Sequence, residues 1–253
     1  MNEIGLPRWH EAQEAEAYYW HESAENVSEL LRITHEKAEA AEWAQRTAGE
    51  IFDSDIEGAW VEVGIGPLGV GCIHFLPESR DRTLIGVDPL PKSEVDKTLI
   101  GPVEALIKAC HGENYHQVSC MGESIELSSN SAALVACYNV LDHCYSPEKV
   151  LKEIWRILKP GGHLLLGCDV YSRAGMMKYS TRTIIARVLG IRLESIGDVG
   201  HPHHFLGVDL ENLVLKVRLK ILSTNARRFE GIRRIWSHSH RMLIMAQKNG
   251  SIG

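Results

Sequence analysis

The sequence has 253 residues, of which 44% are hydrophobic and 24% charged, and its formal net charge is -6 at pH 7. This acidic balance argues against a general nucleic-acid-binding protein, and the sequence carries neither a basic-then-apolar leader nor an apolar run long enough to cross a bilayer. We therefore expect a cytoplasmic protein without a membrane partner, built as one α/β domain with an N-terminal extension. Its six cysteines include no CxxC pair, which favours buried, reduced thiols.

Residues 1–55 are predicted to form a helical cap or lid. Within 10–50, apolar and small residues recur at helical spacing among many glutamates and alanines. This extension could close over a ligand cleft, with Tyr18, Tyr19 and Trp20 lining it as substrate-binding residues. The same aromatic side chains could instead dock the extension on the body, and exposed ones could form a homodimer interface.

The chain is organised around the stretch from Trp60 to Gly69. It predicts a short buried strand, a glycine turn and a helix over 68–76. A second strand over 83–88 ends at Asp88. Strand, glycine turn, helix and strand form the first half of a doubly wound sheet, in which Asp88 is placed to accept hydrogen bonds from a ribose diol.

Two ligands compete for this turn. Gly64, Gly66 and Gly69 satisfy the G-x-G-x-x-G pattern which, with Asp88, suits NAD. Pro67 argues against a dinucleotide, because a pyrophosphate needs backbone N–H donors at the start of the helix and proline removes one. An NAD(P)-dependent oxidoreductase remains an alternative, while a ligand without phosphates tolerates the proline.

The rest of the chain continues the alternation of strands and helices. We expect helices over 103–110, 147–158 and 210–217, and strands over 115–119, 132–138, 163–168, 221–224 and 242–246. The connection over 170–208 follows the fifth strand, where loops overhang the cleft, so it is the predicted acceptor site. Its candidate substrate-binding residues are Tyr171, Met176, Tyr179 and His204. The basic stretch over 214–241 could guide an anionic ligand or form a solvated face.

Five segments carry a family resemblance in their order along the chain. They are Glu62–Pro67, Val87–Asp88, Gly122–Glu123, Asn139–His143 and Arg156–Gly162. This ordered set resembles the class I S-adenosylmethionine-dependent methyltransferases, in the branch that modifies small molecules and glycans. The resemblance covers about residues 55–170 and implies a doubly wound, mostly parallel seven-stranded sheet over 56–253, with S-adenosylmethionine as cofactor and S-adenosylhomocysteine as product.

The resemblance also implies roles for the matching residues. Glu62, Gly64 and Gly66 would surround the methionine portion of the cofactor, and Asp88 would hold the ribose hydroxyls. The adenine would lie between Pro89 with Leu90 and an edge formed by Met121, Gly122 and Glu123, while Asn139 would lie beneath the sulfonium. Two positions depart from the family pattern: Leu68 stands where many members have a third glycine, and Met121 where an acid often binds adenine.

The predicted reaction is methyl transfer to a small-molecule or glycan acceptor. An alcohol acceptor needs a general base, and the candidates are His143, His201, His203 and His204. Because histidines outnumber acids near the predicted cleft, we favour oxygen over nitrogen as the acceptor atom. We expect no metal, since the His201–His204 run has neither the spacing nor the cysteine or carboxylate partners of a structural zinc site. A non-catalytic binding protein on the same fold is the second alternative.

Overall fold

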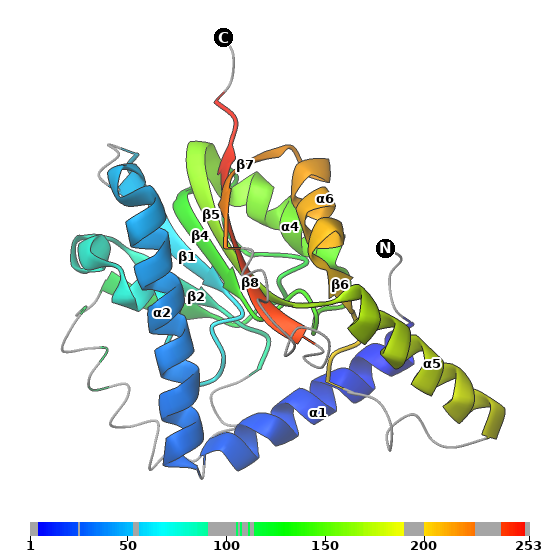
Figure 1. The fold of residues 1–253 in the computed structure, drawn as a ribbon. Helices are drawn as coiled ribbons and strands as arrows, with labels where there is room; N and C mark the ends of the chain where they lie inside the picture. The colour runs from blue at the N-terminus through cyan, green and yellow to red at the C-terminus, as the bar shows by residue number, and fades with distance from the viewer. Residues whose placement is uncertain are drawn as a thin grey trace.

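The computed structural model describes residues 5–24, 26–52, 56–90, 105, 107, 111, 114–189, 200–225 and 239–250. Its helices are α1 (Leu6–Ala24), α2 (Val27–Phe52), α4 (Pro147–Ile157), α5 (Arg173–Leu189) and α6 (Gly207–Lys216), with short 3-10 helices η1 (Cys72–Phe75) and η2 (Pro77–Asp81). Its strands are β1 (Ala59–Val63), β2 (Leu84–Val87), β3 (Tyr115–Val118), β4 (Ala132–Tyr138), β5 (Leu158–Tyr171), β6 (Phe205–Leu206), β7 (Leu219–Thr224) and β8 (Ser239–Lys248). Figure 1 shows α2 on one face of the sheet and α4 and α6 on the other.

The sheet has the strand order β3-β2-β1-β4-β5-β8-β7. The strands from β3 to β5 pair in parallel, whereas β8 runs antiparallel to both β5 and β7. The predicted doubly wound, mostly parallel fold is therefore confirmed, and the two-residue β6 pairs with β5 as an eighth strand. The strand order reverses between β1 and β4, and sheets of this kind bind ligands at the carboxyl ends of their strands at that point.

Alternate residues of β4 contribute to two hydrophobic cores, one on each face of the sheet. Val135 and Cys137 pack with the α4 side of the sheet, where Ile154 is fully buried. Leu134 and Ala136 pack on the opposite face against three alanines of α2, Ala40, Ala41 and Ala44. Every residue of β4 is buried, as expected for a parallel strand covered on both faces. The alanines allow α2 to approach the sheet closely, which attaches the N-terminal helices to the body.

The N-terminal region forms two helices. Asn26 lies between them, and its Oδ1 accepts hydrogen bonds from the backbone N–H groups of Ser28 and Glu29 at 3.1 and 3.3 Å. This is the bonding pattern of a helix N-cap, so α2 begins afresh at Val27 and α1 takes a different direction. In Figure 1, α2 lies along the sheet while α1 runs across one end of the strands. None of the described helices combines the length and the apolar character needed to cross a membrane.

The prediction of an α-helix over 68–76 is wrong. The chain turns through Gly66 and Gly69, which have φ values of 81° and 70°, and then forms only η1 and η2. Glycine is a poor helix former, and the carboxylate of Glu62 accepts the Ile73 N–H at 3.0 Å, which holds η1 against β1. The glycine turn is therefore not followed by an α-helix whose N-terminus could face a ligand.

The remaining differences concern the extent of elements. β5 and β8 are longer than the predicted strands over 163–168 and 242–246, and they pair along nine consecutive residues of β5, from His163 to Tyr171. The connection over 170–208 contains α5 and β6. The helix predicted over 103–110 falls largely outside the described residues.

Candidate active site

A cavity opens at the carboxyl ends of β1, β2 and β4, where the strand order reverses. Nine of the ten residues predicted to bind the cofactor line it: Gly64, Gly66, Asp88, Pro89, Leu90, Met121, Gly122, Glu123 and Asn139. The N-terminal helices contribute Trp9, Gln13, Glu16, Tyr19, Trp20, Arg32, Ile33, Glu36 and Lys37. The wall is completed by Val63, Val87, Tyr138, Val140, His143, Cys144 and Arg241. The cavity thus lies between the sheet and the predicted cap.

The glycine turn can form only with glycine at its first two positions. Gly64 and Gly66 have φ values of 74° and 81°, a left-handed conformation that side chains disfavour. A Cβ on Gly64 would lie 2.0 Å from Cγ2 of Val140, and one on Gly66 would lie 2.9 Å from Cζ2 of Trp20. The missing side chains therefore let Val140 and Trp20 pack directly against the turn.

Asp88 connects the end of β2 to the glycine turn. Its carboxylate accepts hydrogen bonds from the backbone N–H groups of Gly66 at 2.7 Å and Leu90 at 2.9 Å. Burial raises the pKa of Asp88 from 3.8 to about 6, against the lowering effect of these two donors. A carboxylate offers about four acceptor positions, so two remain for hydroxyl groups of a ligand.

Glu62 does not line the cavity, contrary to the prediction. It is fully buried in β1, where it accepts the Ile73 N–H, and a Cβ on Gly71 would lie 2.1 Å from its Oε2. Its other oxygen, Oε1, has no hydrogen-bond partner among the described residues. Glu62 therefore supports the segment that follows the glycine turn from behind.

Lys37 is a site residue that the sequence reasoning missed. It belongs to α2, it is 5% exposed, and its Nζ donates to the backbone carbonyls of Ile65 at 3.0 Å and Val70 at 2.7 Å. The lysine therefore ties the N-terminal cap to both sides of the glycine turn. Its position on the apolar stripe of α2, four residues after Ile33 and four before Ala41, was the available signal.

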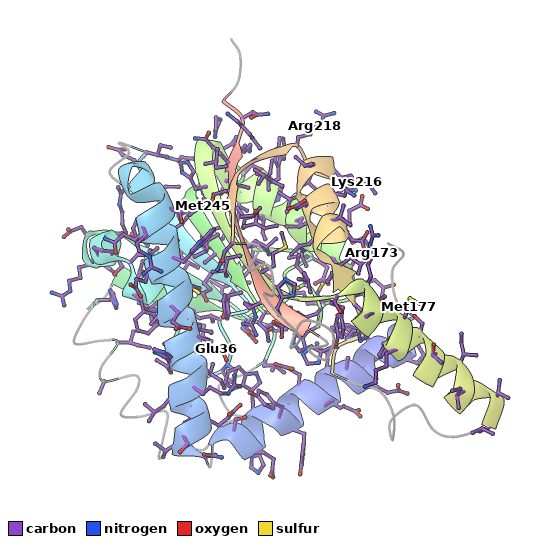
Figure 2. The ribbon with its side chains drawn as sticks, viewed as in Figure 1. Glu36, Arg173, Met177, Lys216, Arg218 and Met245 are labelled. Atoms are coloured by element: carbon purple, nitrogen blue, oxygen red, sulfur yellow. The ribbon has the colours of Figure 1, made fainter. Side chains whose placement is uncertain are left out.

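Arg241 is the second missed residue, and it comes from β8. Its guanidinium donates to Asp169 at 2.6 Å, lies 3.6 Å from Glu36 of α2 and packs 4.7 Å from the centre of the Tyr138 ring. Other basic residues of the same stretch lie elsewhere: Figure 2 shows Lys216 and Arg218 near the end of α6, away from α1. Of the described basic residues over 214–241, Arg241 lines the cavity.

Two of the three predicted N-terminal aromatic residues reach the cavity. Trp20 is 8% exposed, covers Gly66 and donates from its indole N–H to Glu16 at 3.0 Å. The hydroxyl of Tyr19 donates to Glu29 at 2.7 Å, and the ring also lines the cavity. Tyr18 is 65% exposed and lies outside the lining, so the homodimer interface stays a prediction.

Asn139 and His143 follow β4 and meet at the cavity wall. Asn139 has φ 59°, and its Nδ2 lies 3.3 Å from Nε2 of His143. The Nδ1 atom of His143 is 2.7 Å from the carbonyl oxygen of Gly200, which can only accept, so Nδ1 carries the proton. Nε2 is then the acceptor for Asn139. The Oδ1 of Asn139 is buried and has no hydrogen-bond partner among the described residues, which leaves an acceptor for a ligand.

The three histidines of the His201–His204 run go to three different places, and none of them lines the cavity. His201 packs on His143, with ring centres 4.1 Å apart. His203 is buried and bonds to the carbonyl of Cys144 at 2.9 Å. His204 stacks on Tyr179, with ring centres 3.9 Å apart.

The predicted substrate residues of the 170–208 connection also lie outside the lining. Tyr171 packs with His204, with ring centres 5.0 Å apart, and Tyr179 completes an aromatic cluster at the start of α5. Met176 belongs to the first turn of the same helix, which in Figure 2 carries Arg173 and Met177. The connection therefore frames the site through Gly200 and His201, while these aromatic side chains lie apart from the cavity.

Comparison with known proteins agrees with this geometry. Residues 61–166 match the family described as Methyltransferase domain. The thiol S-methyltransferase TMT1B of Rattus norvegicus is 32% identical over 168 residues, which cover 64% of this chain and 64% of that protein. The thiol S-methyltransferase TMT1B of Mus musculus is 31% identical over 46% of this chain and 47% of its own length. This chain thus aligns with less than two thirds of the length of either relative.

Solved structures share the fold at low sequence identity. The 1,6-didemethyltoxoflavin-N1-methyltransferase of Burkholderia thailandensis, solved with S-adenosylhomocysteine, superposes with a TM-score of 0.60 at 12% identity, covering 98% of this chain and 92% of its own. The geranyl diphosphate C-methyltransferase of Streptomyces coelicolor gives a TM-score of 0.55 at 12% identity, over 82% and 76% of the two chains. The ordered motifs, the strand order and the matched domain together support a class I S-adenosylmethionine-dependent methyltransferase, with the family match covering residues 61–166.

Proposed function

We propose that this protein transfers a methyl group from S-adenosylmethionine to a small-molecule acceptor and releases S-adenosylhomocysteine. One observation carries the proposal: motif residues far apart in the sequence, from Gly64 to Asn139, converge on the wall of one cavity. The cavity also fits such a ligand chemically. It offers remaining acceptor positions on Asp88 and an unbonded buried acceptor on Asn139.

Each part of the wall suits one part of the cofactor, whose sulfonium supplies an already activated methyl group. Asp88 would accept hydrogen bonds from the ribose hydroxyls, and Leu90 with Met121 would flank the adenine. The glycine turn, held by Lys37, would surround the methionine portion. Asn139 would lie against the sulfonium and present Oδ1 toward it. The chain's residues would position the reacting groups, which is the main requirement of in-line displacement.

A thiol is the acceptor that we favour. A thiol has a pKa near 8.5, so a fraction of it ionises near neutral pH without a strong base, whereas an alcohol needs one. The base candidate that lines the cavity, His143, already uses both ring nitrogens, Nδ1 toward Gly200 and Nε2 toward Asn139. The two curated relatives described above, both thiol S-methyltransferases, support the same choice.

Methylation of oxygen, on a small molecule or a glycan, stays a prediction and requires a working histidine base. The oxidoreductase alternative has lost support, because the glycine turn is not followed by an α-helix whose N-terminus could bind a pyrophosphate. The helical cap over 1–55 is proposed to act as a lid, since α1 and α2 supply nine of the residues that line the cavity.

Calorimetry and a methyl-transfer assay test the proposal. S-adenosylhomocysteine should bind with one site per chain, while NAD should neither bind nor raise the melting temperature. Incubation with methyl-labelled cofactor and matched pairs of thiols and alcohols of the same carbon skeleton should label the thiols. Labelled alcohols would support the oxygen prediction instead. Binding of the cofactor with no labelled product from any acceptor or from a cell extract would favour a non-catalytic binding protein.

A further inference from the structure

We propose that Asp142, His143 and His201 form a binding site for a divalent transition-metal ion of the zinc class, at the edge of the candidate active site. One potential ligand atom from each residue lies within 4.8 Å of the other two. Oδ2 of Asp142 is 3.8 Å from Nε2 of His143 and 3.7 Å from Nε2 of His201. These separations are too long for hydrogen bonds. They are slightly longer than the roughly 3.3–3.5 Å between ligands of a tetrahedral zinc ion, so a small inward shift would bring the three atoms onto one ion.

The aspartate of this cluster needs a cation. Asp142 is 3% exposed, and its Oδ1 is buried without a hydrogen-bond partner among the described residues. A buried carboxylate is costly unless it is paired, hydrogen-bonded or bound to metal. The two histidines face its other oxygen but do not come within bonding distance. A metal ion between the three groups would bind Oδ2 and compensate the charge of the buried carboxylate.

His143 is held as metal-binding histidines are held. Its Nδ1–H donates to the Gly200 carbonyl at 2.7 Å, and Oε2 of Glu16 lies 3.2 Å from the same nitrogen. A backbone carbonyl on one ring nitrogen fixes the tautomer and leaves the electron pair of the other for a metal. The Asn139 amide donates to Nε2 at 3.3 Å, and a metal ion would replace this hydrogen bond.

The two segments that supply the ligands are joined independently of any ion. Asp142 and His143 follow β4, whereas His201 precedes β6. The backbone N–H of His203 donates to the Asp142 carbonyl at 3.2 Å, and the His203 ring bonds to the Cys144 carbonyl at 2.9 Å. The cluster is therefore built into the packing of these segments, and its ligands would be positioned before the ion binds.

Two imidazoles and one carboxylate suit a borderline transition metal better than magnesium or calcium, which prefer oxygen ligands. Three protein ligands leave one position of a tetrahedral zinc ion open, as in catalytic zinc sites. His143 also lines the candidate active-site cavity. The metal site stands without the proposed function, but one consequence rests on it. A thiol acceptor that binds the ion would lose its proton to solvent, and its sulfur would then attack the methyl carbon as the bond to the sulfonium sulfur breaks.

Zinc titration of the full chain tests the site. Protein freed of metal by dialysis against a chelator should bind one Zn²⁺ per chain by calorimetry and by elemental analysis. The His201→Gln and Asp142→Asn variants should bind at least about tenfold more weakly. The matched control is His204→Gln, which changes a histidine three residues from His201 that stacks on Tyr179 outside the cluster and should bind as wild type does. Replacement of zinc by Co²⁺ should give the visible absorption of a tetrahedral site in the wild type and lose it in His201→Gln.

No zinc bound by the wild type, or equal binding by wild type and His201→Gln, would overturn the inference. Melting temperatures measured with a chelator present report whether both variants fold. His201 is partly exposed, so His201→Gln still tests the metal site if Asp142→Asn does not fold. Calorimetry with S-adenosylhomocysteine on metal-free protein separates the two proposals. Zinc binding without cofactor binding would contradict the proposed function and support the metal site. Cofactor binding without zinc binding would contradict the metal site and leave the proposed function standing.

Discussion

The affinity for S-adenosylhomocysteine should depend on the ionisation of Asp88. Burial raises the pKa of this residue to about 6 in the free protein, and its carboxylate already bonds to the N–H groups of Gly66 and Leu90. Ribose hydroxyls donate more strongly to the charged form, so cofactor binding favours ionised Asp88 and lowers its pKa. Affinity should therefore rise with pH up to about 6 and level off above it.

The size of the effect follows from these bonds. Below pH 6 each unit of pH costs up to about 1.4 kcal/mol of binding free energy, or tenfold in affinity. In the Asp88→Asn variant the amide keeps one oxygen acceptor, while its NH₂ group faces one of the two backbone donors or a ribose hydroxyl. Loss of one hydrogen bond to a charged group costs about 1.5–3 kcal/mol, which lowers affinity about tenfold to more than hundredfold.

Calorimetric titration with S-adenosylhomocysteine at pH 5, 6, 7 and 8 measures both effects. The affinity of the wild type should fall as the pH drops below about 6. Asp88→Asn should bind more weakly at every pH, and its affinity should not change with pH in this way. Asp81→Asn is the matched control, because Asp81 is exposed in η2 and outside the cavity. If Asp88→Asn binds as the wild type does at pH 7, or if both proteins show the same slope below pH 6, the role given to Asp88 is wrong.

Three further substitutions test the turn and its surroundings. Lys37→Met removes both hydrogen bonds to the glycine turn. Calorimetry should show about tenfold weaker cofactor binding, which corresponds to about 1.4 kcal/mol. The exposed control Lys152→Met should bind the cofactor as the wild type does. Gly64→Ala should abolish cofactor binding, because the new Cβ would clash with Val140. Gly161 is the control, since it has a similar φ and a Cβ there would lie 3.3 Å from the nearest atom. Gly161→Ala should cost about 1–2 kcal/mol of stability and leave cofactor binding intact. Burial lowers the pKa of His74 to about 4, so the unfolded chain takes up this proton first as pH falls. His74 should therefore contribute about 2 kcal/mol to the loss of unfolding free energy between pH 7 and 5. By urea unfolding, His74→Gln should lose that much less than the wild type over the same range, and equal losses would contradict the assignment.

The fold and most of the cavity wall were predictable because they depend on local signals. Buried strands that end in Gly64, Asp88 or Asn139 are read from short apolar runs, and parallel strands bring their carboxyl ends to one edge of the sheet. The wrong α-helix over 68–76 shows the limit of this reasoning. Its apolar residues suited a helix, but Gly69 with positive φ and the bond from Ile73 to Glu62 favour 3-10 turns.

The side chains contributed from distant elements were harder to predict. Lys37 and Arg241 lie at opposite ends of the sequence, on a helix and a strand that periodicity places correctly without showing what they face. Glu62 belongs to the glycine motif, yet it points behind the turn, because the side chains of a strand alternate between the two faces of the sheet. A pattern of residue types therefore identifies the turn, while the packing of α2 and β8 decides which side chains meet around it.

The histidines over 201–204 also show that residues close in the sequence can face different elements. His201, His203 and His204 look like one chemical cluster in the sequence, but their neighbours are His143, the Cys144 carbonyl and Tyr179 respectively. Pro202 and the start of β6 at Phe205 turn successive side chains toward different elements. The residues that meet around Asp142 instead come from two segments about 60 residues apart. They come together because β6 pairs with β5 on the same edge as β4, just beyond the end of β4, while β8 occupies the other edge. The proposed metal site is thus a product of strand order, and a search for ligand spacing along the chain could not find it.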